Sequence, residues 1–256
     1  MFNIFVKPSA VHVDCFTDNA TAFNNFKVDA ANKFYPAEFK RLPNKVNVKI
    51  NHNPNSKLEA ETPTVRMCNG ITDLFSNGFI LPSWEKFSIE ITEHGEQFSH
   101  SNTAQATNTT IYHHHDRIQY GFELFKNWTH AKLLSPWLME EKSGIKFTWN
   151  MCDYHRTDIA DVFKVLPAVI DYKYQIQTHV NCFIKNGNII TIEAGDPLVQ
   201  MIPLTEKKVK LHHHLLSTED WIKKQQTVMV QTTYHNHRKL NLPDAHKSKC
   251  PFGFGK

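Results

Sequence analysis

Histidine is the residue type whose number and grouping in this chain suggest chemistry. The 256 residues include 16 histidines, several of them in the clusters His113-His114-His115-Asp116, His212-His213-His214 and His235-Asn236-His237. Side chains alternate along a strand, so His113 would share a face with His115. In the same way, His212 would share a face with His214. Such pairs could supply the imidazoles of a zinc or iron centre, as in jelly-roll metal enzymes.

The same clusters admit two further interpretations. Each triplet also places one histidine on the opposite face, and no glutamate follows at a spacing that would complete a metal site, so exposed or interface histidines fit the pattern as well. Histidines at a subunit contact would change charge as the pH falls through about 6.5, the unperturbed imidazole pKa. That change could switch the contact.

A second candidate site lies between residues 168 and 202. The segment Ala168-Val169-Ile170-Asp171-Tyr172-Lys173-Tyr174 is followed by a hairpin signal and then by Gly195-Asp196-Pro197-Leu198-Val199-Gln200. In order and spacing this stretch resembles the dUTP pyrophosphatase family, in which Gly-Val-Ile-Asp-x-x-Tyr precedes Gly-Asp-Arg-Ile-Ala-Gln. The resemblance is specific over residues 167–204, extends more loosely from residue 133, and implies a β-clip fold.

The resemblance implies roles for four residues. Asp171 would be the carboxylate that activates water, and Tyr174 the ring beneath the deoxyribose. Ser135, in Ser135-Pro136-Trp137, is the nearest counterpart of the family's phosphate-binding Arg-Ser-Gly segment, and Gln200 ends the second motif. Both would contact the nucleotide, while a magnesium ion would neutralise the phosphates.

The sequence departs from that family where the nucleotide lies close to the backbone. Ala168 and Ile176 replace two family glycines, so side chains would crowd the pocket. No arginine accompanies Ser135, which removes a phosphate donor needed for catalysis. A turn aspartate at Asp171 and a core-facing Tyr174 are the structural interpretation. We therefore expect a degenerate nucleotide site on a retained scaffold.

Two further segments resemble proteins of a particular origin. The Trp137 region and the ending at residues 249–255 are similar to uncharacterised proteins encoded by tailed phages of marine bacteria. This resemblance implies a location in the host cytoplasm or the virion, with other phage structural proteins as partners. Because β-clip proteins of the dUTP pyrophosphatase family are typically trimers, the first resemblance implies a homo-oligomer, a trimer.

Composition and charge exclude several classes of protein. Hydrophobic residues make up 41% of the chain and charged residues 21%, as in ordinary folded proteins. Lys and Arg number 29 against 25 Asp and Glu, but residues 235–256 alone hold five basic residues and one acidic residue. The body is therefore neutral, which argues against a general nucleic-acid-binding surface.

Other sequence features narrow the class further. Apolar runs are short, so we expect no membrane-spanning helix and no membrane partner, and the first residues do not resemble a secretion signal. The five cysteines are odd in number and form no C-x-x-C pair, which favours a reducing compartment. The chain also lacks the common phosphate-loop, dinucleotide, zinc-protease and nucleophile-elbow motifs.

The elements that must position these residues are mostly strands. Period-two patterns predict strands at residues 10–16, 46–50, 87–91, 145–149 and 209–215, and a mostly apolar run after the turn at 195–197 predicts a buried strand at 198–202. Asn186-Gly187 between residues 180–184 and 189–192 predicts a hairpin. Short helical turns are expected within 19–43, and loops at 51–64 and 99–110. Ser217 with Asp220 predicts a capped helix over 221–230.

The sequence thus predicts a mainly β, β-clip or jelly-roll-like single domain with few helices. Its predicted segments are 1–85, strands and turns packed on the core; 86–216, the β-rich core; and 217–256, a helix and basic arm. Three functions remain open: a phage structural or binding protein without catalysis and without a cofactor; a divergent nucleotide pyrophosphatase using magnesium; and a cupin-like metal enzyme. Residues around Asp171 and the convergence of the histidines would discriminate them.

Overall fold

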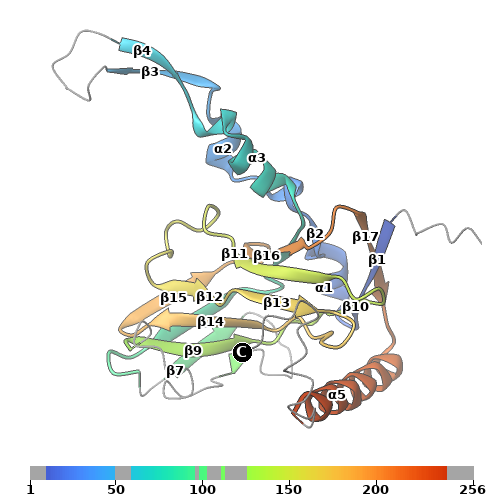
Figure 1. The fold of residues 1–256 in the computed structure, drawn as a ribbon. Coiled ribbons are helices and arrows are strands. Elements are labelled where there is room, and N and C mark those ends of the chain that lie inside the picture. Colours follow the sequence, from blue (N-terminus) through green and yellow to red (C-terminus); the bar gives the residue numbers. More distant parts are fainter. Residues whose placement is uncertain (1–9, 50–58, 96–97, 103–110, 113–125, 241–256) are drawn as a thin grey trace, which may run out of the picture.

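The computed structural model describes residues 10–49, 59–95, 98–102, 111–112 and 126–240 (Figure 1). Within these residues the chain is mainly β, which confirms the predicted fold class. The strands form a body. An arm of two strands and short helices projects from one side of the body, and a long helix lies on the other side (Figure 1).

Small sheets build the body, and each combines strands from different parts of the sequence. One has the order β10-β1-β17, with bounds Leu138–Glu141, Ala10–Thr17 and Lys208–Leu215. A second has the order β13-β11-β16-β5-β2, with bounds Ala168–Asp171, Lys146–Met151, Pro197–Pro203, Phe79–Pro82 and Asp29–Ala30. A third has the order β12-β14-β9-β8, with bounds Phe163–Val165, Val180–Lys185, Trp128–Leu133 and Ile111–Tyr112. A fourth has the order β15-β6-β7, with bounds Asn188–Ile192, Phe87–Ile91 and Phe98–Asn102.

The first and the last strand of the described chain lie side by side in the first of these sheets. Strand β1 pairs in parallel with β17 and antiparallel with β10. Strands β2 and β5 join the same sheet as β11, β13 and β16. Residues from the predicted segment 1–85 therefore supply strands of the body itself.

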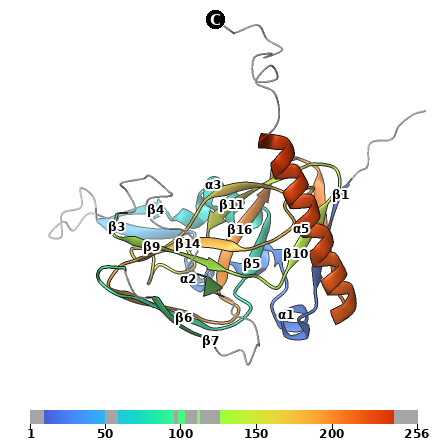
Figure 2. The ribbon, with the colours of Figure 1, turned by 90° about the horizontal axis from the view of Figure 1, so that it is seen from below.

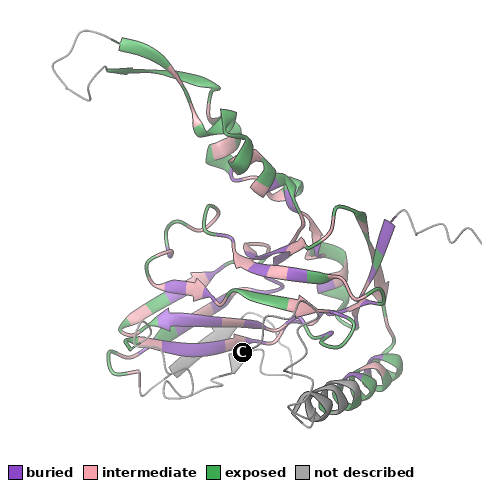
Figure 3. Ribbon diagram, viewed as in Figure 1, coloured by how far each residue is buried: buried purple, intermediate pink, exposed green. Residues whose placement is uncertain are grey.

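A continuous apolar cluster fills the space between the sheets. Its largest members, including Trp137, Phe147 and Tyr172, are fully buried. Figure 3 shows the buried residues concentrated on the strands of the body. Burying one such side chain contributes about 1.5–3 kcal/mol, so this cluster is the main source of the body's stability.

The prediction of a hairpin at Asn186-Gly187 is wrong, because the two flanking strands do not pair with each other. The chain does turn there, with Gly187 at φ 76°, but β14 pairs with β9 and β12, whereas β15 pairs with β6. The amide of Gly187 donates to the carbonyls of Ile91 and Thr92 at 3.0 and 3.1 Å. The turn is thus held by the end of β6, which draws β15 into a different sheet from β14.

Two predicted loops also contain strands. Residues 59–63 form β4, and residues 98–102 form β7, which pairs with β6. Their polar composition hid them, because neither segment shows the apolar alternation that predicts a half-buried strand. Residues 51–58 and 103–110 of these two predicted loops lie outside the described residues.

Short helices occupy the region where helical turns were predicted. They are α1 (Ala20–Asn25), the 3-10 turn η1 (Ala31–Phe34) and α2 (Ala37–Arg41). Asn19 begins α1, because its side-chain oxygen accepts the amide of Ala22 at 2.9 Å. This is the role that asparagine commonly takes at a helix start.

The arm consists of residues 35–77. It contains α2, the antiparallel strands β3 (Lys45–Lys49) and β4 (Glu59–Pro63), the 3-10 turn η3 (Val65–Met67) and α3 (Asn69–Ser76). The chain returns to the body at Gly78, which has φ 77°. A Cβ atom there would lie 2.1 Å from the carbonyl oxygen of Met201, so only glycine fits this close approach.

Helix α5 (Thr218–Leu240) lies alongside β10 and β1 (Figure 2). Its buried residues Trp221 and Val228 pack with Leu138 and Ile176. The predicted cap is present: Ser217 Oγ accepts the amide of Asp220 at 3.1 Å and contacts its carboxylate at 2.8 Å. Among the described residues, no helix combines the length and apolarity needed to span a bilayer.

Candidate functional site

Asp171 and Tyr174, predicted from the family resemblance, lie in the turn that ends β13. The Asp171 carboxylate accepts the amide of Lys173 at 3.1 Å, and its carbonyl accepts the amides of Tyr174 and Gln175 at 3.0 and 2.9 Å. Tyr174 is 39% exposed, with Lys173 Nζ 5.7 Å from its ring centre. Asp171 thus stabilises a turn, and Tyr174 lies at the surface.

The core-facing tyrosine of this segment is Tyr172. Its ring is fully buried, and its hydroxyl accepts the indole N–H of Trp149 at 2.8 Å and contacts the sulfur of Met201 at 3.1 Å. Burial raises the pKa of Tyr172 far above its ordinary value. The hydroxyl therefore stays protonated and contributes packing and hydrogen bonding.

Ser135 is buried in the turn between β9 and β10. Its hydroxyl accepts the amide of Trp137 at 3.2 Å and lies 2.8 Å from the hydroxyl of Thr178. Thr178 also contacts the Trp137 carbonyl at 2.7 Å. This closed set of contacts holds Trp137 in the core, so Ser135 has a structural role in the fold.

Gln200 connects the body to the arm. Its side-chain nitrogen donates to the carbonyls of Leu74 and Asn77 at 2.5 and 2.9 Å. Both acceptors belong to the end of α3. The residue expected to contact a nucleotide therefore binds the backbone at the base of the arm.

The register of the sheet separates Asp171 from Gln200. Asp171 pairs with Lys146 on one side of β11, and Gln200 pairs with Asn150 on the other. Four residues along a strand and two strand spacings across it place the two residues roughly 16 Å apart. With their side chains already bonded, these residues do not fit a shared site for a nucleotide and magnesium.

His212 and His214 lie on the solvent face of β17, and His113 and His115 lie outside the described residues. His212 stacks on His12, with ring nitrogens 2.8 Å apart. His214 Nε2 lies 2.8 Å from the carboxylate of Asp14, and its ring stacks on Phe16. Each of these two histidines thus has its own partner on β1.

His213 points the opposite way, as strand alternation requires. Its Nε2 lies 2.9 Å from the carbonyl of Val28, and its ring meets Trp137 edge to face. Burial lowers the pKa of His213 below its ordinary value, and the nearby charge of Lys27 acts in the same direction. His213 therefore belongs to the packing between β17 and the segment before β2.

Among the described residues, His212 and His214 do not form a zinc or iron centre by themselves, and their predicted partners His113 and His115 lie outside that part of the chain. In the part of the chain that the structure covers, no group of three or more His, Cys, Asp or Glu side chains is placed to hold a metal ion. His212 and His214 are engaged separately, and a structural or catalytic zinc site needs at least three protein ligands around one point.

Sequence reasoning missed Arg156. Its guanidinium bonds both carboxylate oxygens of Asp158 at 2.9 Å, the carboxylate of Asp196, and the carbonyl of Thr191 at 2.8 Å. These bonds raise the pKa of Arg156, and the hydrogen bond to Arg156 lowers that of Asp158. Arg156 thus fixes the Gly195-Asp196 turn to the loop after β11. Arg156 and Asp196 are 40 residues apart in the sequence, and no motif indicates that they are in contact.

A small pocket lies beside Arg156. It is lined mainly by apolar side chains, among them Cys152, Phe163 and Leu198. Burial raises the pKa of the Cys152 thiol well above its ordinary value, which disfavours the nucleophilic thiolate. The guanidinium is already bonded to two carboxylates, so this pocket offers packing rather than a reactive group.

The hairpin of the arm has an apolar face. Val46 lies opposite Thr62, and Val48 lies opposite Ala60. Because side chains alternate along strands, these four residues share one face. Val46 and Val48 are each 38% exposed. An apolar strand face thus stands open to solvent on an element that projects from the body (Figure 3).

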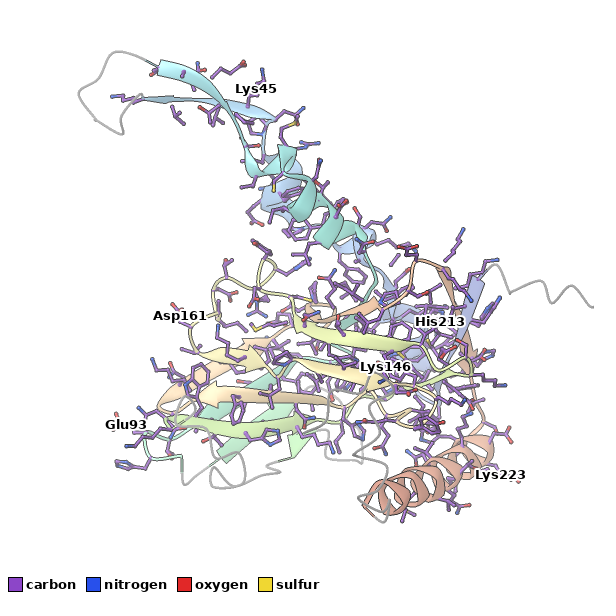
Figure 4. All side chains as sticks on the ribbon, in the orientation of Figure 1. Lys45, Glu93, Lys146, Asp161, His213 and Lys223 are labelled. Carbon is purple, nitrogen blue, oxygen red and sulfur yellow. The ribbon has the colours of Figure 1, made fainter. Side chains whose placement is uncertain are left out.

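The other face of the hairpin is charged. Lys45 Nζ contacts the carboxylate of Glu61 at 2.8 Å, and Lys49 lies opposite Glu59. The lysines are on β3 and the glutamates on β4. The hairpin therefore has one basic edge and one acidic edge. Figure 4 shows Lys45 on the arm, well separated from the labelled residues of the body.

The neck of the hairpin is closed by hydrogen bonds. The amide of Thr64 donates to the carbonyl of Asn44 at 2.9 Å, and its hydroxyl donates to the carbonyl of Pro43 at 2.6 Å. Arg66 donates to the carbonyl of Leu42 at 2.9 Å. The hairpin thus begins and ends at adjacent points.

Aromatic side chains hold the base of the arm on the body. Phe75 of α3 is buried and contacts Tyr154 and His155 edge to face, with ring centres 5.5 and 5.9 Å apart. Phe39 of α2 packs on the same ring at 4.7 Å. His155 Nε2 lies 2.5 Å from the carbonyl of Phe34. With Gln200, these contacts give the arm a defined base.

Asp171, Ser135 and Gln200, predicted to act on a nucleotide, are thus engaged in a turn, the core and the base of the arm. No model of a known protein family matches this chain, and no curated protein matches it. Its function has to be inferred from the molecule's own geometry. Among the described residues, the hairpin of the arm is a two-stranded sheet whose side chains are largely exposed.

Proposed function

We propose that this protein is a phage-encoded structural or binding protein without catalytic activity, located in the host cytoplasm or the virion. A body of β-clip type would serve as the scaffold, and the arm would make contacts with other molecules. The resemblance of the Trp137 region and residues 249–255 to phage proteins supports the origin. The mainly β body agrees with a β-clip scaffold.

The exposed hairpin of the arm is the observation that carries this proposal. A two-stranded hairpin alone is marginally stable in water and needs a further strand or a packed face. All of β3 is exposed, as is all of β4 apart from Thr62, which is half-buried. Contact with another molecule would cover the apolar face and pair the free edges.

The contacts made by the residues predicted to bind or act on a nucleotide support the same proposal. Asp171 holds a turn, Ser135 holds Trp137, and Gln200 holds α3. Each side chain already has an internal partner, so binding a nucleotide would require breaking contacts of the fold. A scaffold that has lost its site but kept its strands is the simplest account of this arrangement.

Excision of the hairpin tests the proposal. Residues 45–63 can be replaced by Asn-Gly, a two-residue turn, because Asn44 and Thr64 are hydrogen-bonded neighbours. We expect the full-length protein to form an oligomer, measured by light scattering after size-exclusion chromatography. The excised variant should be a folded monomer with a cooperative unfolding transition, because the hairpin lies outside the body's core.

A matched control replaces Lys142 and Lys185, exposed lysines of the body, by alanine and should leave the oligomer intact. The proposal would be overturned if the full chain were monomeric at about 100 µM. It would also be overturned if the excised protein assembled like the full chain. Hydrolysis of a deoxynucleoside triphosphate by the purified protein would argue for the pyrophosphatase alternative.

A further inference from the structure

We infer that the arm's partner is the arm of a second copy of this chain, with β3 of one copy pairing with β4 of the next. This inference rests on the proposed function and identifies the contact. Repeated from copy to copy, the pairing would form a closed ring of hairpins. The apolar faces would lie inside it and the charged faces outside.

The charges on the two edges carry the argument. β3 contributes Lys45 and Lys49 to the charged face, and β4 contributes Glu59 and Glu61. Pairing β3 with β3 of another copy would set lysines beside lysines, and opposed like charges destabilise a strand pair. Pairing β3 with β4 of the next copy sets lysines beside glutamates. The charges thus select a head-to-tail contact.

The backbone agrees with this choice. β3 and β4 are antiparallel, so a β3 to β4 contact between copies continues an antiparallel sheet without a change of direction. A head-to-tail contact is heterologous and closes into a ring when the rotation permits. Closure would leave no free edge, and free edges are what natural sheets avoid.

The apolar face fits the inside of such a ring. Val46, Val48, Ala60 and Thr62 are small or β-branched, and small closed sheets fill their interior with side chains of this kind. Each copy would add two strands. Three copies, the trimer that the family resemblance implies, would form a closed sheet with a narrow interior.

The anchored base explains why the partner is not the arm's own body. Gln200, Tyr154 and His155 hold α3 to the body, and the hairpin points away from it (Figure 1). The arm would have to detach from this base to fold back. A second copy can present its arm beside the first without any such change.

Two charge variants test the contact between arms. Lys45→Glu with Lys49→Glu makes an arm that carries only acidic residues on its charged face. Glu59→Lys with Glu61→Lys makes one that carries only basic residues. We expect each variant alone to be a monomer at about 0.1 M salt. A chain that carries all four substitutions should assemble again, because lysines then face glutamates at every head-to-tail contact, whatever the number of copies. This chain should dissociate at 1 M salt, where the screening length is about 3 Å.

Failure of the chain with all four substitutions to assemble would overturn the inference. If hairpin excision still abolished the oligomer, the proposed function would stand and the arm would bind another surface. If neither charge variant altered the oligomer, the inference would likewise be overturned. The double variant Lys142→Glu with Lys185→Glu, on the body, is the control and should assemble as the unaltered protein does.

A cross-link gives a readout that does not depend on charge. Chains with Val48→Cys and chains with Ala60→Cys, tagged differently and both carrying Cys68→Ser, are mixed and oxidised. We expect a disulfide between the two kinds of chain. Ile189→Cys, exposed on β15, is the control partner and should give none. Equal cross-linking to Ile189→Cys would count against the inference.

Discussion

The side-chain amide of Gln200 donates to the backbone carbonyl of Leu74 at 2.5 Å, across 126 residues of sequence. A second bond from the same nitrogen reaches Asn77. A buried side chain of the central sheet thus determines where the last turn of α3 rests. The position of the arm is therefore specified by the body's core.

Gln200→Glu tests this anchor, because glutamate has the same shape but no N–H donors. Two carbonyls that are now satisfied would face a carboxylate, and we expect a loss of about 2 kcal/mol in the free energy of unfolding. Hydrogen exchange should rise first in α3. Gln226→Glu, on the exposed side of α5, should change the stability by less than about 0.5 kcal/mol. Unchanged exchange in α3 would contradict the anchoring role.

A fall in pH should loosen the same base through His155. Burial lowers the pKa of His155 below its ordinary value of 6.5, although its backbone hydrogen bonds act in the opposite direction. In the unfolded chain His155 becomes protonated near pH 6.5, whereas in the folded protein it becomes protonated only at a lower pH. The contribution of neutral His155 to the free energy of unfolding is therefore fully present above pH 6.5, and it is lost as the pH falls toward the lowered pKa.

We expect exchange in α3 to increase between pH 7 and pH 5, and His155→Gln to flatten that dependence. His213 has a lowered pKa for the same main reason and contributes with the same sign, but it lies at β17. Measuring exchange locally at α3 separates the two. A pH dependence that survived in His155→Gln would assign it to another group.

Arg156→Met should destabilise the turn at Asp196. The guanidinium is largely buried and bonds both Asp158 and Asp196, so its removal leaves Asp196 with the amide of Glu193. We expect a loss of about 2 kcal/mol in chemical denaturation, since hydrogen bonds to charged groups are the stronger class. Lys86→Met breaks an exposed pair with Glu193 and should cost less than about 1 kcal/mol. If both substitutions lowered the free energy of unfolding equally, the buried pair would contribute no more than the exposed pair, contrary to the prediction.

The double variant Asp171→Asn with Tyr174→Phe should leave the response to nucleotides unchanged. Asparagine keeps the side-chain oxygen that accepts the Lys173 amide, and Tyr174 lies at the surface. We expect no thermal shift with any dNTP and magnesium, before or after substitution. Stabilisation of the unaltered protein by about 2.7 kcal/mol at about 100 times Kd, lost in the variant, would revive the pyrophosphatase alternative.

The fold was predictable from sequence where one face of a strand is buried. The alternation in β1, β6, β11 and β17 follows from a core on one side and solvent on the other, and Ser217 marks the start of α5 by local chemistry. Strand β4, which is largely exposed, and strand β7 carry no such pattern. The turn at Asn186-Gly187 was read correctly, but the pairing of its flanking strands depends on β6 and β9, which lie far away in the sequence.

The candidate site was less predictable, for a related reason. The turn role of Asp171 was one of the two interpretations of its sequence, and its contact with Lys173 is local. Ser135 and Gln200 suggested chemistry, but their contacts with Thr178 and Leu74 decide what they do. The pairing of His12 with His212 joins residues 200 positions apart. Short-range patterns cannot report such contacts. One strand of the arm's hairpin was predicted, because the alternation of Val46 and Val48 indicates a strand at β3. The other strand, β4, was not.

The closed neck at Asn44 and Thr64 makes the hairpin a self-contained module. Chain entry and exit are adjacent there, so a different sequence of any length could occupy the same place without disturbing the body. The position is suited to the display of foreign peptides. It would also let the contact surface diverge between related proteins while the scaffold stays the same.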